Sequence, residues 1–231
     1  YKSYFKAIFM LYLIGIGLID EKDISIKGLE VVKKAKYVYL ENYTSVLQVE
    51  RDKLEKFYGK EMGLATRDLV ENHSDEILKR AVNSDVAFLV VGDIFGATTH
   101  IDLVLRAREK GIKVKFIHNA SILNAVWVIG LELYKYGRVT SIPFDNKNVK
   151  TPIEVYKQNK KLGLHTLFLL DLDVNNNKFM TIEDACKYLI KNKINELAIG
   201  CSGIGSYEQD IKVGKISELK YKTFHFLKPQ C

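Results

Sequence analysis

The clearest hydrophobic pattern in the chain is an unbroken apolar run, Val86–Val91, that leads into a polar segment containing Gly92 and Gly96. An apolar run of this length is typical of a strand covered on both faces, as in a parallel sheet. The glycines allow the backbone to turn sharply and to approach a ligand closely. Asp93 follows at the carboxyl end of the strand, the edge where open α/β sheets bind ligands. The pattern indicates a binding loop, although the same residue types also form ordinary turns and helix caps.

Strand and helix patterns alternate through the first half of the chain, as in parallel α/β architecture. The pattern predicts strands at residues 11–16, 36–40, 86–91 and 113–117, and helices at residues 23–36, 75–82 and 99–110. Gly111 follows the last of these helices, at the position where glycine commonly ends a helix. The first half therefore has the pattern of one α/β domain.

The second half, beyond His118, has a different order of elements. We expect strands at residues 139–142, 165–174 and 196–201, and helices at residues 123–130, 151–161 and 181–191. Residues Thr151–Glu154 match a capping box with proline at the first helical position. We therefore expect an extension at residues 1–9, an N-terminal α/β domain at residues 10–120 and a C-terminal α/β domain at residues 121–231.

A second apolar run, Ala7–Ile19, lies near the start of the chain. It is too short to span a bilayer, which needs about 20 apolar residues. Gly15 and Gly17 would weaken a helix and suit a strand that ends in a ligand loop. We interpret the run as the first strand, with Met10 as the natural beginning of the fold, and we expect no membrane partner.

Composition restricts the class of protein. With 231 residues and 47% hydrophobic content, the chain can bury the core of one large domain or two small ones. Its three cysteines, Cys186, Cys201 and Cys231, are odd in number and widely spaced, which argues against a disulfide framework and favours the cytosol. The five histidines show no metal-ligand spacing, so we predict no bound metal.

The formal net charge of +7 raises the question of nucleic acid. The lysines are scattered over the expected helices with acids between them, and no aromatic-basic motif of an RNA-recognition module is present. We therefore favour solvated helix surface over direct nucleic-acid binding. The charge balance still suits docking to an acidic or ribosome-associated partner.

The end of the first expected strand superficially matches a dinucleotide-binding site. Gly15 and Gly17 follow this strand, and Glu41 ends the next strand. The match fails at the third glycine of the motif, which is replaced by Asp20. A bare pair of glycines is weak evidence, and a tight strand exit explains it at least as well.

A longer match concerns Gly92–His100, which reads Gly-Asp-Ile-Phe-Gly-Ala-Thr-Thr-His after the apolar strand. This segment resembles the signature of diphthine synthases, S-adenosylmethionine-dependent methyltransferases of the tetrapyrrole-methylase-like, or class III, fold. Further segments that resemble the family are 12–18, 23–30, 39–45, 117–125, 133–137 and 164–171. The resemblance covers most of the chain and implies two α/β domains with the cofactor in the cleft between them.

The resemblance also implies the residues that hold S-adenosylmethionine. By motif, these are Leu18, Asp93, Gly96, Ser121, Ile122, Leu170, Ile204 and His225. A largely apolar pocket with a few polar groups suits the adenine and the methionine chain. Three of the residues have ordinary alternatives, since Ser121 suits a helix cap, Leu170 a core position and His225 a strand. The motifs identify no catalytic residue, and His100 and His165 are only guesses for a general base.

Residues 118–122, His-Asn-Ala-Ser-Ile, resemble the eukaryotic branch of the family. The implied substrate is the 3-amino-3-carboxypropyl-histidine of elongation factor 2. Four methylations would give diphthine methyl ester, with S-adenosylhomocysteine as the other product, and the family usually forms homodimers. The alternatives are another class III methylase acting on a tetrapyrrole or ribosomal RNA, and a non-catalytic module that binds the ribosome.

Overall fold

The computed structural model describes residues 9–96, 100–224 and 228–231. The chain divides into two compact units, one ending at Ser121 and the other beginning at Ile122. Each unit is considered by itself below. Within the described residues, we find no helix with the length and apolar character needed to cross a membrane.

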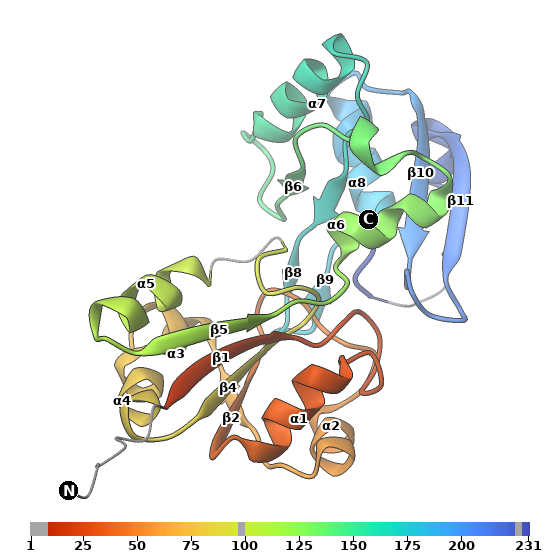
Figure 1. The fold of residues 1–231 in the computed structure, drawn as a ribbon. Helices are drawn as coiled ribbons and strands as arrows, with labels where there is room; N and C mark the ends of the chain where they lie inside the picture. Colours follow the sequence, from red (N-terminus) through yellow and green to blue (C-terminus); the bar gives the residue numbers. More distant parts are fainter. Residues whose placement is uncertain (1–8, 97–99, 225–227) are drawn as a thin grey trace, which may run out of the picture. The chain divides into compact units, whose positions relative to one another are not determined.

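The first unit is built on a five-stranded parallel sheet, with strand order β3-β2-β4-β1-β5 (Figure 1). The strands are β1 (Met10–Gly15), β2 (Tyr37–Glu41), β3 (Gly63–Ala65), β4 (Val86–Val90) and β5 (Lys113–Ile117). The helices are α1 (Ile26–Lys34), α2 (Arg51–Tyr58), α3 (Arg67–Glu71), α4 (Asp75–Asn83) and α5 (Ile101–Glu109). Strand β4 lies at the centre of the sheet, between β2 and β1.

The apolar run of β4 supplies both faces of the sheet. Val86, Phe88 and Val90 belong to one buried cluster, together with residues from α3, α4 and α5. Ala87 and Leu89 belong to a second buried cluster, together with residues from α1 and α2. Side chains alternate between the faces of a strand, so a strand with helices on both sides needs apolar residues at every position. This explains why the strand shows no polar alternation.

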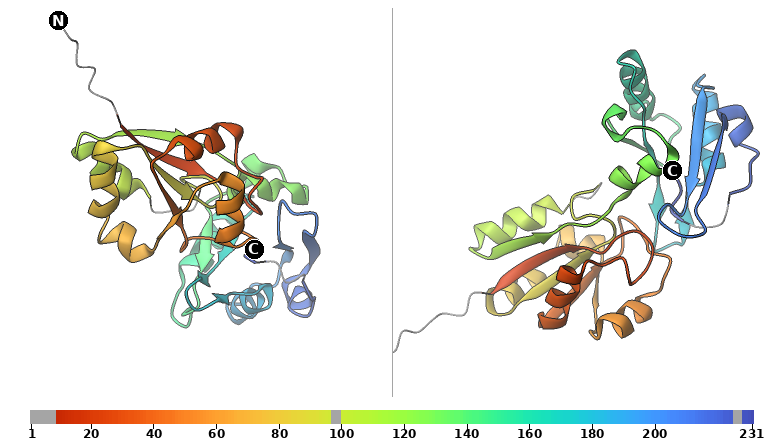
Figure 2. Two further views of the ribbon diagram at one scale, coloured as in Figure 1. Left: turned by 90° about the horizontal axis from the view of Figure 1, so that it is seen from below. Right: turned by 45° about the vertical axis from the view of Figure 1, so that its right-hand side comes forward.

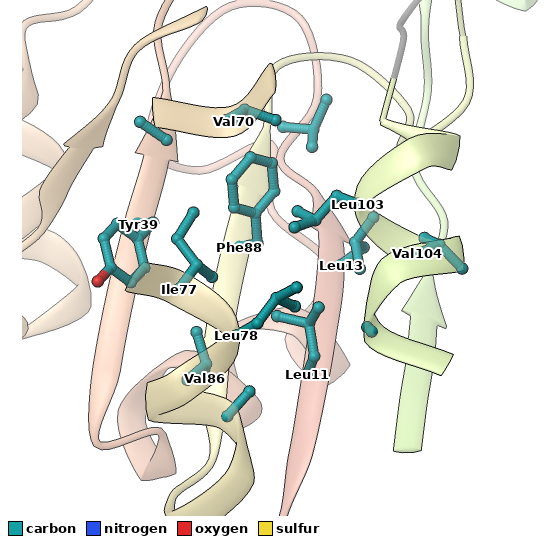
Figure 3. Packing of buried hydrophobic residues seen from close by; sticks show 14 of the residues in the cluster. Leu11, Leu13, Tyr39, Val70, Ile77, Leu78, Val86, Phe88, Leu103 and Val104 are labelled. Atoms are coloured by element: carbon teal, nitrogen blue, oxygen red, sulfur yellow. The ribbon is translucent and has the colours of Figure 1, made fainter. Parts of the chain in front are cut away.

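Phe88 is the largest side chain that β4 contributes to the first of these clusters, and it is fully buried. Figure 3 shows its ring among Val70, Ile77 and Leu103, which come from α3, α4 and α5. One side chain of the central strand thus contacts the layer formed by three helices, which lie in separate parts of the sequence.

Over its described residues, the second unit contains three two-stranded sheets and four α-helices. Strands β6 (Thr140–Ile142) and β7 (Phe168–Leu170) pair in parallel, whereas β8 (Leu172–Asp173) with β9 (Lys178–Phe179) and β10 (Leu197–Ser202) with β11 (Asp210–Lys215) are antiparallel. The longest of these pairs, β10 with β11, is visible in Figure 2. The helices and short 3-10 turns of the second unit are α6 (Ile122–Ala125), η1 (Val126–Ile129), η2 (Leu133–Lys135), α7 (Thr151–Lys161), α8 (Ile182–Lys191) and α9 (Ile216–Leu219).

The expected strand at 165–174 is two short strands in the structure, because the chain changes its partner at Asp171. Before this residue β7 pairs with β6, and after it β8 pairs with β9. The Asp171 carboxylate accepts hydrogen bonds from the backbone N–H groups of Phe144 and Leu172, both at 2.9 Å. An apolar run alone does not reveal such a change of partner.

The prediction of a capping box at Thr151 was wrong. Helix α7 does span 151–161 as predicted, but its N-cap is Lys150 and no side chain caps it. A complete capping box is present instead at α8, where Thr181 and Asp184 bond each other's backbone N–H groups. Pattern matching found the helix and missed the cap because Thr151 already lies inside the first turn.

We predict that Phe88→Ala destabilises the first unit by about 3–5 kcal/mol, the usual cost of removing a fully buried phenylalanine. The matched control is Phe57→Ala, since the Phe57 residue is 44% exposed on α2. Its cost should stay below about 1 kcal/mol. Urea unfolding of both variants measures the difference, and equal losses would show that the cluster around Phe88 does not hold this unit together.

Candidate functional site

The carboxyl ends of β1 and β4 are joined by a pair of glycines. The Gly92 N–H donates to the Gly17 carbonyl at 2.6 Å, and the Gly17 N–H donates to the Gly92 carbonyl at 3.3 Å. Both glycines have positive φ, +83° and +81°, a conformation that other residues rarely adopt. At Gly15, a Cβ atom would lie 2.6 Å from the Gly92 carbonyl oxygen. The two loops therefore meet only because these positions lack side chains.

The loop that carries Leu18 is held by Asp23. The Asp23 carboxylate accepts hydrogen bonds from the N–H groups of Leu18, at 3.0 Å, and Ile19, at 2.7 Å. The side-chain amide of Asn119 donates to the carbonyls of Gly15, at 3.0 Å, and Asp23, at 2.9 Å. Asn119 follows β5, so its amide ties the end of that strand to the first loop.

Asp93 connects the same residue to the end of β4. One carboxylate oxygen accepts from the Asn119 N–H at 2.9 Å and from Nδ1 of His118 at 2.9 Å, while the other accepts from the Phe95 N–H at 3.2 Å. Burial would raise the pKa of Asp93, but the hydrogen bonds from Asn119, Phe95 and His118 outweigh it and hold the pKa below its ordinary value. The side chain remains 17% exposed. Asp93 is thus an anion at the sheet edge, organised by its own chain and still accessible to solvent.

Gly96 and Ser121 lie against each other in the first unit. A Cβ atom at Gly96 would stand 2.8 Å from both Cβ and Oγ of Ser121, a separation that real side chains do not tolerate. Ser121 itself is buried. The loop after β4 and the segment after β5 therefore pack closely, and the absence of a side chain at Gly96 allows this contact.

Glu41, at the end of β2, is hydrogen-bonded to the loop that follows this strand. Its carboxylate accepts from the N–H groups of Tyr43 at 2.7 Å and Thr44 at 2.6 Å, and from the Thr44 hydroxyl at 2.8 Å. The residue is 1% exposed, and burial raises its pKa although these hydrogen bonds oppose the shift. Such a buried carboxylate is not presented to a ligand, unlike the ribose-binding acid of a dinucleotide site.

His100 lies inside the sheet edge and is completely buried. Its ring stacks on Tyr43, with centroids 5.9 Å apart, and meets Phe88 edge-on at 5.3 Å. Neither ring nitrogen has a hydrogen-bond partner among the described residues. Burial lowers the pKa of His100 to about 4, so the ring is neutral at physiological pH.

In the second unit, three of the residues expected to bind the cofactor occupy different settings. Ile122 begins α6 and is half-buried. Leu170 ends β7 and belongs to the buried cluster around α8. Ile204 is buried in the loop after β10, between Gly203 and Gly205, both with positive φ. His225 lies outside the described residues.

Comparison with protein families identifies the first level of relationship. The family model of Tetrapyrrole (Corrin/Porphyrin) Methylases matches residues 10–220. The chain belongs to this family. Two curated relatives then identify a narrower group within this family. Diphthine methyl ester synthase of Aspergillus fumigatus is 46% identical, with 91% of this chain and 83% of that protein covered, and that of Yarrowia lipolytica is 48% identical, with coverage of 91% and 79%.

Solved structures agree with the sequence relatives. A crystal structure of diphthine synthase superposes with a TM-score of 0.89 at 38% identity, covering 95% of this chain and 86% of that one. A putative diphthine synthase from Entamoeba histolytica gives a TM-score of 0.87 at 38% identity, with coverage of 96% and 90%. This tetrapyrrole methylase therefore belongs to the diphthine methyl ester synthases and is a methyltransferase, which confirms the fold class and the enzyme class predicted from the sequence.

Within the first unit of this methylase, the structure brings four residues of the predicted cofactor set to the same edge of the sheet. Leu18, Asp93, Gly96 and Ser121 all lie in the first unit, in loops that follow β1, β4 and β5. Hydrogen bonds and close glycine contacts join these loops directly. The cofactor role of all eight residues stays a prediction.

Sequence reasoning missed two residues that organise this edge of the methylase, Asp23 and Asn119. Asn119 lies within a segment that resembles the family, but its side chain acts on backbone carbonyls far away in the sequence. No local pattern reveals such a bond. Among the described residues, no group of three or more histidine, cysteine, aspartate or glutamate side chains is placed to hold a metal ion.

The two histidines considered as general bases have different surroundings in the methylase. His100 is enclosed by aromatic rings and reaches no solvent. His165 packs edge-on against Tyr136, with ring centroids 5.6 Å apart. The burial of His100 makes it unsuited to exchange protons with a bound substrate, since a general base must reach the proton that it removes.

We predict that Gly96→Ala destabilises the methylase by about 1–3 kcal/mol, because the added methyl group overlaps Ser121. Ser121→Gly removes the overlapping atoms, so the double variant should recover at least about 1 kcal/mol relative to the sum of the single changes. Urea unfolding of the four proteins completes the cycle. Strict additivity would mean that the two residues do not meet.

A second prediction concerns acid stability. The pKa of His100 is about 4 in the folded state and about 6.5 when unfolded, so the unfolded state binds more protons between these values. The neutral ring contributes fully above pH 6.5, and about 3 kcal/mol of stability is lost as the pH falls toward 4. As the pH falls from 6.5 toward 4, the free energy of unfolding of wild type should decrease by this amount relative to that of His100→Phe, as measured by unfolding titrations.

The control for this pH profile is His73→Gln, because the His73 side chain is 68% exposed. Between pH 6.5 and pH 4 the free energy of unfolding of the control should stay within about 0.5 kcal/mol of wild type, because surface substitutions have small effects. Parallel profiles for wild type and His100→Phe would contradict the assignment of a depressed pKa to His100.

Proposed function

We propose that this methyltransferase modifies the 3-amino-3-carboxypropyl-histidine of elongation factor 2, with S-adenosylmethionine as methyl donor and S-adenosylhomocysteine as product. The observation that carries the proposal is 46–48% identity to two diphthine methyl ester synthases over 91% of the chain. As in the eukaryotic branch, four methylations would give diphthine methyl ester.

The first unit offers a suitable place for one side of the cofactor. Loops that follow three adjacent strands meet there, and the absence of side chains at Gly15, Gly17 and Gly92 lets their backbones approach one another closely. Asp93 is anionic and partly exposed, and one of its carboxylate oxygens accepts, from the residues that the structure describes, the Phe95 N–H alone, which leaves it further acceptor capacity. A carboxylate suits a ligand with an ammonium and a sulfonium group.

The remaining members of the proposed site are mostly apolar. Ile122, Leu170 and Ile204 would contribute hydrophobic contacts, and Leu18, Gly96 and Ser121 would contribute backbone and small groups, together with His225. This mixture is typical of sites that enclose a nucleoside and fix it with a few polar groups.

When bound, S-adenosylmethionine supplies a methyl group on a positively charged sulfur, so the protein needs no covalent intermediate. The work left to the chain is to hold the donor and the acceptor in line and to exclude water, which can supply about 7–11 kcal/mol in favourable cases. The fixed loops around Asp93 and Asn119 serve that purpose. The acceptor amine must lose a proton, and water or a substrate group is our proposal for its destination.

We also propose a cytoplasmic homodimer with elongation factor 2 as its protein partner. The support is the family relationship and the odd number and wide sequence spacing of the cysteines, which favour a reducing compartment. The high identity to diphthine methyl ester synthases favours this substrate over a tetrapyrrole or ribosomal RNA. It equally favours an enzyme over a non-catalytic module on the ribosome.

The decisive experiment is transfer of labelled methyl from S-adenosylmethionine to elongation factor 2 that carries the aminocarboxypropyl histidine, followed by mass spectrometry of that residue. Four methyl groups, one of them an ester, are expected. Three would assign the archaeal type of product. Absence of transfer despite cofactor binding would reject elongation factor 2 as the acceptor.

We predict that Asp93→Asn weakens S-adenosylmethionine binding about 10- to 100-fold, because a charge-assisted contact contributes about 1.5–3 kcal/mol. The amide keeps the shape of the carboxylate but removes its charge. Asp145→Asn, an exposed aspartate of the second unit, is the matched control and should bind normally. Calorimetry measures the affinities.

A loss of folding must be separated from a loss of binding in this experiment. Asp93 accepts three hydrogen bonds from described residues of its own chain, so Asp93→Asn should also lower the free energy of unfolding by about 1–3 kcal/mol. Circular dichroism at the assay temperature checks that the variant is folded. Unchanged affinity in a folded variant would remove Asp93 from the cofactor site.

A further inference from the structure

Two cysteines that are distant in the sequence face each other in the second unit. The Cys201 N–H donates to the Cys231 carbonyl at 2.7 Å, and the Cys231 N–H donates to the Cys201 carbonyl at 2.9 Å. The neighbouring residues, Ser202 and Gln230, form an antiparallel bridge in the same register. Cys201 also pairs with Ile211 of β11, so β10 has partners on both edges at this position.

This pairing brings the two thiols together. Residues that exchange both backbone hydrogen bonds stand directly opposite, with Cα atoms about 5.5 Å apart, and their side chains project from the same face. That separation lies within the range of natural disulfides, about 4.4–6.8 Å. The thiols are hydrogen-bonded to each other, and both cysteines are free.

The surroundings favour ionisation of one thiol. The hydrogen bond from Cys231 lowers the pKa of Cys201, although burial opposes the shift, while the pKa of the donor Cys231 is raised by that same bond and by burial. The third cysteine, Cys186, is also buried, and burial raises its pKa to about 11. Thiolate is the reactive form, so Cys186 provides an unreactive reference within the same unit.

We propose that Cys201 and Cys231 form a redox-sensitive pair, which hydrogen peroxide converts into an intramolecular disulfide. The Cys201 thiolate attacks one oxygen of the peroxide, the O–O bond breaks, and a sulfenic acid and hydroxide result; the hydroxide takes up the proton that the Cys201 thiol released and becomes the first water. The Cys231 sulfur then attacks the sulfenic sulfur, the S–O bond breaks, and a second water leaves. Two thiols are oxidised and one peroxide is reduced to two waters.

The geometry suits a reversible bond rather than a permanent one. Directly opposed residues have Cβ atoms about 4.5–5.5 Å apart, whereas a disulfide prefers about 3.5–4.5 Å. Closing the bond must therefore draw the two strands together. Strained disulfides are more easily reduced, so a cellular dithiol would return the pair to its free form.

The bond would close a covalent loop over residues 201–231. This loop contains Ile204 and His225, two residues of the proposed cofactor site, although the disulfide itself does not depend on that proposal. Oxidation would add a covalent link between Cys231 and β10, where two main-chain hydrogen bonds join Cys201 and Cys231 in the reduced chain.

The test is to treat the folded, reduced chain with a small excess of hydrogen peroxide, block free thiols with an alkylating reagent and digest with trypsin without reduction. The expected product joins peptide 194–212 to peptide 223–231 and is lighter than their sum by two hydrogen atoms. Peptide 179–187, which carries Cys186, should be found alkylated. Dithiothreitol should separate the joined peptides.

Variants distinguish this pair from general oxidation. Cys186→Ser should form the joined peptide as wild type does, whereas Cys201→Ser and Cys231→Ser should not. Peroxide should also raise the melting temperature of wild type by a few degrees, and leave Cys231→Ser unchanged. The proposal is overturned if Cys186 is oxidised as fast as Cys201, or if the only disulfides join separate chains.

Discussion

The burial of β4 on both faces, with a parallel strand on each edge, is the constraint on which the first unit depends. A central strand in this position cannot shift by one residue without exchanging the side chains of the two cores. The residues that follow it are therefore fixed in space. The packing of Phe88 and Leu89 thus determines where Gly92 and Asp93 begin the loop, and the hydrogen bonds of these two residues then hold it there.

The hydrogen bonds at the carboxyl edge extend this order to the loops. Asn119 contacts Gly15 and Asp23 through its side chain and Asp93 through its backbone. Strands β1, β4 and β5 are thus joined beyond their last ladder bonds. The loops of a parallel sheet usually vary in conformation more than the strands, and here three of them share one network of bonds.

The sequence predicted the fold of the first unit well because its signals are local. Val86–Val91 and Lys113–Ile117 carry strand patterns that need no knowledge of their partners. The sequence signals were weaker where the structure depends on which distant segment a strand pairs with. The break at Asp171 depends on two different neighbours, and helices α2 and α3 and the short strand β3 were not identified in advance. Helix α8 was placed within one residue, because its capping residue and apolar face lie within a few positions of each other.

The candidate site likewise has features that local sequence patterns predicted and features that they did not. Glycine and aspartate after a strand indicate a ligand loop, and the resemblance to diphthine synthases supplied the residue set. The partners of Asp93 and the facing of Cys201 and Cys231 arise from contacts between distant segments. Wide spacing in the sequence suggested that the cysteines are independent, and the pairing of the last described residues with β10 shows that two of them are neighbours.

The reciprocal bonds of Gly17 and Gly92 have a consequence for the thermodynamics of recognition. Loops that must be ordered by a ligand reduce its affinity, because part of the interaction energy is used to restrict their motion. Here the two loops are already fastened to each other by their own backbones. A ligand that enters this edge meets a preorganised surface, so its binding should show a small entropic penalty from the protein in the first unit.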